Sequence, residues 1–154
     1  MNLVVDASVA VKWLVKESDT DKAEALLESC RLGKYDPVAP ELLVAEVGSV
    51  LSKRVRQGSM KASQAEFQFD RFNRIRPVLK PLLDLAGQAF KLALVHQHSV
   101  YDCLYVALAL EAQCELVTAD EKLFRTFSPS YPNVKLLRLW PWPISHIEEV
   151  KHLI

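Results

Sequence analysis

Glycine is scarce in this 154-residue chain, and its four glycines form no known phosphate-binding or nucleophile turn. None of them builds the G-x-G-x-x-G turn of dinucleotide-binding proteins or a P-loop, and no G-x-S-x-G elbow occurs. The sequence therefore gives no support to a nucleotide-binding enzyme of these types or to a serine hydrolase of the elbow type.

The sequence also has few cysteines, no long apolar run and no net charge. The three cysteines are Cys30, Cys103 and Cys114; without a C-x-x-C pair they suit a reducing cytosol and offer no structural metal site. No apolar run approaches the ~18 residues of a membrane span, and the N-terminus lacks the basic start of a signal peptide, so we expect a cytoplasmic protein without membrane association. Basic and acidic residues number 19 each, so nucleic-acid binding would depend on a local basic patch.

Short apolar runs typical of strands alternate with helical patterns along the chain. The expected strands are residues 3–5, 36–40 (strand or loop), 75–79, 115–118 and 134–139. The segment 75–79 reads as an edge strand because Pro77 cannot donate a backbone hydrogen bond. The expected helices are residues 7–15, a helix that follows the 18–20 turn and ends near 33, 41–57, 59–72, 83–97, 100–113 and a short one ending near 127. This alternation predicts an α/β fold with a mainly parallel sheet of four to five strands and helices on both faces.

The chain length predicts one domain, residues 1–154, which can bury roughly 70% of its unfolded surface. Trp140-Pro141-Trp142-Pro143 marks the start of a C-terminal tail at about residue 140. Its tryptophans either pack on the body of the domain or lie at a dimer interface, and packing is favoured.

Two acids directly follow predicted strands. Asp6 ends the run Leu3-Val4-Val5, Asp120 ends the run that begins at residue 115, and each precedes a short helix. In an open α/β sheet, ligands bind where strands end and helices begin, so both acids point to a functional edge. Aspartate is also a favoured helix N-cap, which is a purely structural explanation for each.

Two further acids lie in apolar helices. Glu46 falls in the apolar stripe of helix 41–57, flanked by Leu42 and Val50 at helical spacing, where a carboxylate is costly unless a salt bridge compensates it. Asp102 opens the most apolar helix, 100–113, so we expect it to be buried with the first turn. The spacing Ser99-x-x-Asp102 also fits a capping box.

One explanation covers all four acids, namely convergence at the carboxyl edge of the sheet: Asp6, Glu46, Asp102 and Asp120. Carboxylates that lie close together repel one another unless a cation lies among them, and hard oxygen ligands suit Mg²⁺ or Mn²⁺. Such a site can activate a water and stabilise the attacking and leaving oxygens at a phosphorus. Ser8 and Thr118 could hydrogen-bond the acids or a metal-bound water, although such hydroxyls more often satisfy the backbone.

Four segments occur in a fixed order along the chain: Val4-Val5-Asp6-Ala7-Ser8, the Glu46 helix, Tyr101-Asp102-Cys103-Leu104-Tyr105-Val106-Ala107-Leu108-Ala109, and Leu116-Val117-Thr118-Ala119-Asp120. Together they resemble the PIN-domain nucleases, and among these the VapC-type toxins of prokaryotic toxin–antitoxin pairs. The resemblance covers nearly the whole chain. The Tyr-Asp-x-x-Tyr-x-Ala-Leu-Ala and Thr-Ala-Asp segments are the more specific ones, and the first segment alone would be weak.

The resemblance implies a three-layer α/β/α sandwich and a ribonuclease that uses Mg²⁺ or Mn²⁺, with Asp6, Glu46, Asp102 and Asp120 as its metal-binding acids. It also implies an RNA substrate, a homodimer, and inhibition by a small antitoxin that fills the active-site groove. Some relatives carry a further acid or Asn just beyond the Thr-Ala-Asp segment. Here only Glu121 could add such a ligand, so the number of metal ions, one or two, stays open.

Other polar residues give weaker signals. Two basic groups could contact RNA phosphates: Lys12 with Lys53, Arg54 and Arg56, and Arg71 with Arg74, Arg76 and Lys80. A solvated helix face is the favoured alternative for most of them. His96 and His98 are interpreted as a helix end rather than a metal pair, and Cys103 as a core residue rather than a nucleophile.

The resulting hypothesis is a metal-dependent endoribonuclease in which a metal-bound water attacks the scissile phosphate. One rival is a phosphatase with an aspartate nucleophile, which is disfavoured because Asp6-Ala7-Ser8 lacks the second aspartate, two residues on, that this chemistry commonly uses as its acid. Another rival is a catalytically silent module that binds RNA or protein. The presence of all four acids argues against it.

Overall fold

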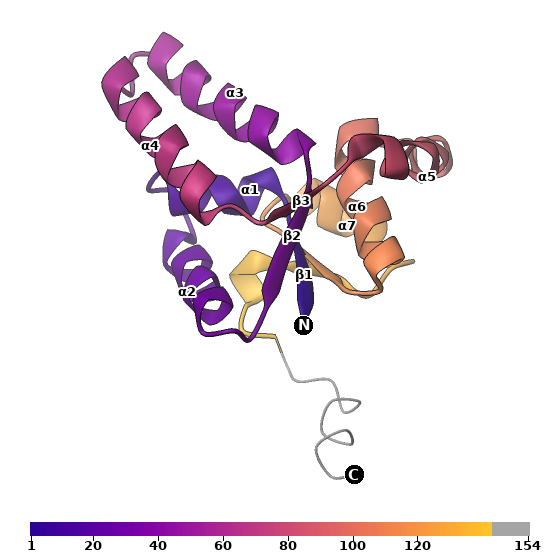
Figure 1. The fold of residues 1–154 in the computed structure, drawn as a ribbon. Helices are drawn as coiled ribbons and strands as arrows, with labels where there is room; N and C mark the ends of the chain where they lie inside the picture. Colours follow the sequence, from indigo (N-terminus) through magenta and orange to yellow (C-terminus); the bar gives the residue numbers. More distant parts are fainter. Residues whose placement is uncertain (143–154) are drawn as a thin grey trace.

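A single parallel sheet forms the centre of residues 1–142, the part of the chain that the computed structural model describes (Figure 1). Its strands are β1 (Asn2–Val5), β2 (Asp36–Pro40), β3 (Val78–Lys80), β4 (Glu115–Thr118) and β5 (Val134–Leu136). They lie in the order β3-β2-β1-β4-β5, and every neighbouring pair is parallel. The predicted α/β class and the five strands are therefore confirmed.

Helices cover both faces of the sheet, as parallel strands require. They are α1 (Ala7–Ala10) with a 3₁₀ turn (Val11–Trp13), α2 (Thr20–Arg31), α3 (Leu42–Arg56), α4 (Ala62–Ile75), α5 (Leu82–His96), α6 (Val100–Ala112) and α7 (Glu121–Phe127). Helices α1 to α4 lie on one side of the sheet and α5 to α7 on the other, which gives the expected three layers (Figure 1). Helices α3 and α4 form an antiparallel pair that extends beyond the sheet (Figure 1).

The order of the strands places a topological switch between β1 and β4. From β1 the chain continues to β2 on one side, and only later adds β4 on the other. Ligands of open α/β sheets bind in the crevice outside the carboxyl ends of strands at such a switch. The register pairs Val5 with Val117, so the residues that follow these two, Asp6 and Thr118, lie side by side at that edge.

Several element boundaries differ from the sequence-based expectation for local reasons. The third strand begins at Val78 rather than residue 75, because Pro77 holds the preceding Arg76 in an extended conformation that ends α4. Helix α4 starts at Ala62, not at residue 59. The expected helix over 7–15 changes to 3₁₀ geometry after Ala10, and the expected strand over 134–139 becomes a 3₁₀ turn after Leu136.

The first part of the predicted tail packs on the domain. Trp140 and Trp142 contact the hydrophobic core, and the indole N–H of Trp142 donates to the Leu136 carbonyl at 3.1 Å. Packing, rather than exposure at an interface, is thus confirmed for these two tryptophans. The rest of the predicted tail, from Pro143 onward, lies outside the described residues. Within residues 1–142 no helix is both long enough and apolar enough to cross a bilayer.

Candidate active site

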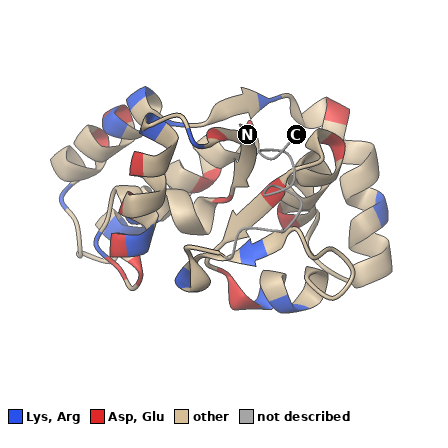
Figure 2. Cartoon of the chain, turned by 90° about the horizontal axis from the view of Figure 1, so that it is seen from below, with Lys and Arg blue, Asp and Glu red and all other residues tan. Residues whose placement is uncertain are grey.

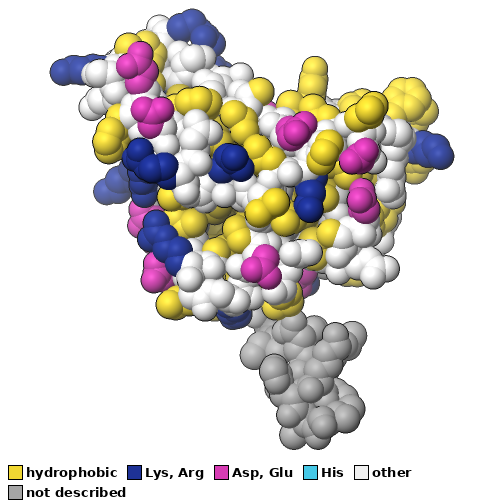
Figure 3. All heavy atoms as spheres, viewed as in Figure 1, with side chains coloured by type: hydrophobic (Ala, Val, Ile, Leu, Met, Phe, Trp, Pro, Cys, Tyr) yellow, Lys and Arg dark blue, Asp and Glu magenta, His cyan; other side chains and the backbone are white. Residues whose placement is uncertain are grey.

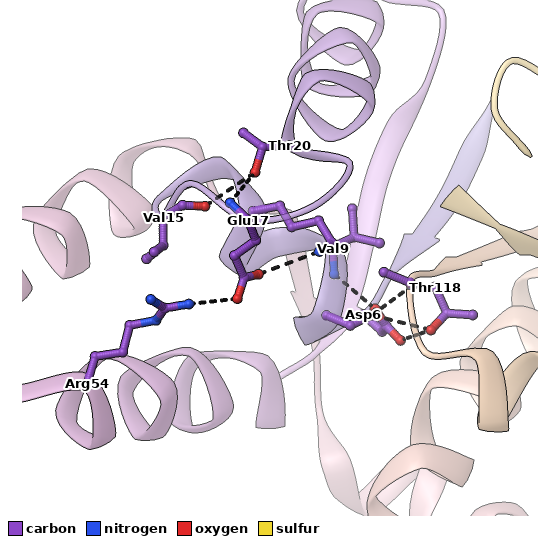
Figure 4. Close-up of polar contacts among 10 residues, drawn as sticks. Asp6, Val9, Val15, Glu17, Thr20, Arg54 and Thr118 are labelled. Carbon is purple, nitrogen blue, oxygen red and sulfur yellow. Dashed lines mark hydrogen bonds and ion pairs between the residues drawn. The ribbon is translucent and has the colours of Figure 1, made fainter. Parts of the chain in front are cut away.

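Asp6 lies directly after the buried residues Leu3–Val5 of β1 and accepts three hydrogen bonds. Its Oδ1 accepts from the Ser8 hydroxyl at 2.5 Å and from the Val9 backbone N–H at 3.2 Å, and its Oδ2 accepts from the Thr118 hydroxyl (Figure 4). Asp6 therefore is the helix N-cap that one explanation predicted. The side chain is also only 5% exposed, and burial raises its pKa from the usual 3.8 to about 7 despite these donors.

Ser8 and Thr118 tie the ends of β1 and β4 together around this carboxylate. The Ala119 backbone N–H donates to the Ser8 hydroxyl at 2.8 Å, and the Asp120 N–H donates to the Thr118 hydroxyl at 3.0 Å. Each hydroxyl thus accepts from the β4–α7 connection while it donates to Asp6. The two hydroxyl residues satisfy the backbone and hold Asp6 in place at the same time.

Glu46 lies on the second turn of α3, partly buried, as its apolar flanks predicted. Its partner is not a cation, since Oε1 accepts from the Tyr105 hydroxyl of α6 at 2.7 Å. Burial raises the pKa of Glu46, the Tyr105 hydrogen bond lowers it, and the charge of Asp102 raises it. Burial also raises the pKa of Tyr105, which keeps its hydroxyl protonated and able to donate.

Asp102 is more open than the sequence predicted. Its side chain is 32% exposed, and the fully buried part of α6 begins only at Cys103, so the expectation that Asp102 is buried was wrong. The capping box is also wrong in detail, because the Ser99 hydroxyl accepts from the Tyr101 N–H. The Asp102 carboxylate instead contacts His98, with 2.7 Å between Oδ2 and Nε2.

Asp120 caps α7 and faces solvent. Its Oδ1 accepts from the N–H groups of Lys122 at 2.9 Å and Leu123 at 3.2 Å. The following Glu121, the one candidate for an extra ligand, is exposed and pairs with Arg138 through a 3.1 Å contact. The Asp120 backbone N–H donates to the Thr118 hydroxyl, so this acid is connected to Asp6 through Thr118.

Two of the four acids, Glu46 and Asp102, line one groove, and Asp6 lies near it. Burial is the main cause of the raised pKa of Asp6 and of Glu46, and the negative charge of Asp102 raises both further. Glu46 and Asp102 line a groove of about 460 Å³ whose floor includes Ala7, the residue after Asp6. Within residues 1–142 no three acidic, histidine or cysteine side chains are yet close enough to ligate one ion directly.

Comparison with known protein families shows the family of this chain. Residues 3–127 match the family model described as the PIN domain, which is most of the chain. The chain belongs to the PIN-domain family. Ribonuclease VapC3 of Pyrobaculum aerophilum is 33% identical to this PIN domain over 130 residues, an alignment that covers 82% of this chain and 95% of that relative.

Solved structures show the same fold at lower identity. The crystal structure of PAE2754 from Pyrobaculum aerophilum superposes with a TM-score of 0.65 at 21% identity, covering 90% of this chain and 93% of the other. VapBC2 from Rickettsia felis, bound to a DNA fragment from their promoter, superposes with a TM-score of 0.59 at 19% identity and covers 88% and 97%. The resemblance to PIN-domain, VapC-type proteins that the four sequence segments indicated is confirmed.

The donor set of this PIN domain fits a hard divalent cation. All four acids present carboxylate oxygens, which Mg²⁺ and Mn²⁺ prefer. Mg²⁺ is commonly held by one or two carboxylates and keeps several waters, so an open arrangement around Asp6, Glu46 and Asp102 suits it. Burial raises the pKa of Asp6, so a cation beside this carboxyl would favour its ionised form.

The basic residues of the PIN domain fall into two kinds. Lys12 is buried and Arg54 half-buried, and both pair with Glu17, at 3.6 Å and 2.7 Å (Figure 4). Lys53 and Arg56, by contrast, are exposed on the last turns of α3. Lysine and arginine gather towards the α3–α4 side of the molecule, whereas apolar side chains cover much of the α5 side (Figures 2 and 3).

Two partners of the acids were not predicted. Tyr105 follows Asp102 by three residues and lies on the same face of α6, so helical spacing alone could have placed it at the site. His98 was correctly assigned to a helix end region, beyond the last residue of α5, but its bond to Asp102 was missed. Its i,i+4 spacing from Asp102 was the available signal. The core assignment of Cys103 is confirmed, since this side chain is fully buried.

Proposed function

We propose that this protein is an endoribonuclease and the toxin of a toxin–antitoxin pair, and that it uses Mg²⁺ or Mn²⁺. Membership of the PIN family and the relatives named VapC ribonucleases support hydrolysis of RNA. The observation that carries the metal site is the buried Asp6 carboxylate, held by three donors at the switch between β1 and β4 with its pKa raised to about 7. Asp6, Glu46, Asp102 and Asp120 would hold the ion.

A bound divalent cation supplies a nucleophilic water near neutral pH and offsets the negative charge that develops at the scissile phosphate. The chain itself supplies rigid ligands. Ser8, Thr118 and the Val9 N–H fix Asp6, and the Tyr105 hydroxyl fixes Glu46 at the wall of the groove.

Contacts to RNA phosphates would come from the basic side of the molecule. Lys53 and Arg56 are exposed at the end of α3, the helix that carries Glu46. Lys12 and Arg54 would contact RNA only by sharing or leaving Glu17. We therefore expect Lys53 and Arg56 to contribute more to RNA affinity than the other two residues.

Two apolar surfaces support protein partners. An antitoxin that fills the active-site groove beside Glu46 could extend along α3 into a second groove of about 520 Å³ between α3 and α4, lined by apolar atoms of Leu51, Val55 and Phe69. On α5, Leu83, Phe90 and Leu94 are more than half exposed and follow one stripe, which supports a homodimer. The VapBC2 structure from Rickettsia felis, a toxin–antitoxin complex, contains a chain of the same fold. The free, scattered cysteines suit a reducing compartment, so we propose that the protein is cytoplasmic.

Cleavage of a structured RNA pool by purified, partner-free protein tests this proposal. Reactions in Mn²⁺, Mg²⁺ or EDTA are run beside Asp102→Asn, which removes one carboxylate charge with little change in shape. We expect cleavage in Mn²⁺ or Mg²⁺ and its loss in EDTA and in the variant. Cleavage that persists in Asp102→Asn would refute the site, and RNA binding without cleavage would favour the silent module. Hydrolysis of generic phosphate esters would favour the phosphatase.

A further inference from the structure

His98 occupies the joint between three helices. Its backbone N–H donates to the Ala93 carbonyl at 3.3 Å, which fixes it to the end of α5. Its ring packs at 72° against the ring of Phe127 at the end of α7, with 5.3 Å between the centroids. Its side chain is only 5% exposed. The His98 backbone is therefore held by α5, and its imidazole is packed against α7.

The Nε2 edge of this ring faces Asp102. The Nε2 atom lies 2.7 Å from Oδ2, and a carboxylate can only accept, so Nε2 carries the proton and donates it. Within residues 1–142 no other donor contacts the Asp102 carboxylate. Because Asp102 is a third exposed and sits on the open first turn of α6, this single bond sets the direction of its carboxylate.

The other two acids, Asp6 and Glu46, are each fixed by a buried side-chain hydroxyl. Asp6 has Thr118, which is fully buried, and Glu46 has Tyr105, which is 1% exposed. His98 takes the same part for Asp102. It lies outside the predicted Tyr-Asp motif, on the preceding connection, and none of the proposed chemistry uses it.

We propose that His98 is a positioning residue, whose Nε2–H holds Oδ2 of Asp102 and thereby fixes this carboxylate at the groove where a divalent cation would bind. This inference rests on the metal site of the proposed function. Hydrogen bonds to a ligating carboxylate orient it before the ion arrives, and loss of such outer partners typically weakens metal affinity about 10- to 100-fold.

Calorimetric titration of Mn²⁺ into the metal-stripped full-length protein at pH 8 tests the inference. His98→Leu keeps an apolar contact with Phe127 and removes the donor. His98→Gln places an amide N–H at about the same distance from the backbone as Nε2, whereas the side chain of His98→Asn is too short to reach Asp102. His96→Leu is the matched control, since His96 packs on the same Phe127 ring at 4.8 Å. Urea unfolding of each variant reports separately on stability.

We expect His98→Leu to bind Mn²⁺ about 10- to 100-fold more weakly, with His98→Gln and His96→Leu close to wild type. If His98→Leu does not fold, His98→Asn against His98→Gln makes the same comparison. If the variants that lack the donor bind Mn²⁺ with wild-type affinity, this inference is overturned and the proposed function is not. Equal weakening in His96→Leu and in His98→Gln would also overturn it, because the effect would then be one of packing. If wild-type protein binds no Mn²⁺, or binds it no better than Asp102→Asn, the metal site of the proposed function is wrong and the inference falls with it.

Discussion

Replacing Asp6 with asparagine should make the metal-free protein more stable at neutral pH. Burial raises the pKa of Asp6 from 3.8 to about 7, so the folded protein favours the protonated form far more than the unfolded chain does. Well below pH 3.8 both states hold the proton and there is no penalty, and near pH 4 the penalty is still small. Between pH 4 and 7 the unfolded chain releases its proton while the folded protein retains it, so stability falls as the pH rises.

The size of the effect follows from the same pKa. One pKa unit corresponds to about 1.4 kcal/mol, so a charged Asp6 lowers the free energy of unfolding by up to about 4 kcal/mol above pH 7. Asparagine can keep the surrounding hydrogen bonds. Its carbonyl accepts from Ser8 and Val9, and its amide donates to the Thr118 hydroxyl, which retains lone pairs for this purpose.

Urea unfolding in EDTA at a series of pH values from 4 to 8 measures this difference. We expect Asp6→Asn and wild type to agree near pH 4, and the variant to become more stable as the pH rises, by up to about 4 kcal/mol. Mn²⁺ should then stabilise wild type at pH 8 more than the variant, because the variant lacks one of the four proposed carboxylate ligands. A variant whose stability differs from wild type by the same amount at pH 4 and pH 8 would refute the reasoning.

Other substitutions probe separate contacts. Tyr105→Phe removes the hydrogen-bond donor that lowers the pKa of Glu46. We expect the free energy of unfolding to drop by about 1 to 3 kcal/mol and Mn²⁺ binding to require a higher pH. If the pH dependence of Mn²⁺ binding does not change, the role assigned to Tyr105 is contradicted. Glu17→Gln leaves the buried Lys12 without its carboxylate, and urea unfolding should show a loss of about 1 to 3 kcal/mol, below the range for a fully buried pair because Glu17 is 30% exposed. Glu28→Gln, at an exposed pair, is the control and should change stability by less than about 1 kcal/mol; equal losses in the two variants would contradict the importance of burial.

The framework of the fold was predictable because its signals are local. The runs before Asp6 and Asp120 are apolar and rich in β-branched residues, and they become β1 and β4. Pro77 indicated an edge strand, and β3 is indeed at the edge of the sheet. The two explanations offered for Asp6 and Asp120, cap and functional acid, proved not to exclude each other, because a helix that starts at a strand end puts its cap at the functional edge.

Contacts between distant parts of the chain were not predictable in the same way. Glu46 and Tyr105 are 59 residues apart, and a wheel projection shows only that Glu46 needs a partner, not which one. Lys12 was expected on a solvated face or at RNA. It lies instead in the 3₁₀ turn after Ala10, where its side chain is buried and pairs with Glu17. Glu17 also pairs with Arg54 of α3 (Figure 4), and such contacts between separate elements do not follow from the pattern of one helix.

The cation site is tested most directly by counting the protons released when Mn²⁺ binds. Carboxylate ligands must lose their protons to bind a metal, so release depends on their pKa values. At pH 6 the Asp6 carboxyl is mostly protonated, and calorimetry in two buffers of different ionisation enthalpy should show close to one proton released per Mn²⁺ in wild type and much less at pH 8.5. Asp6→Asn should bind Mn²⁺ weakly and release no such proton. Tight binding by Asp6→Asn with the same proton release as wild type would contradict the assignment of Asp6 to the metal site.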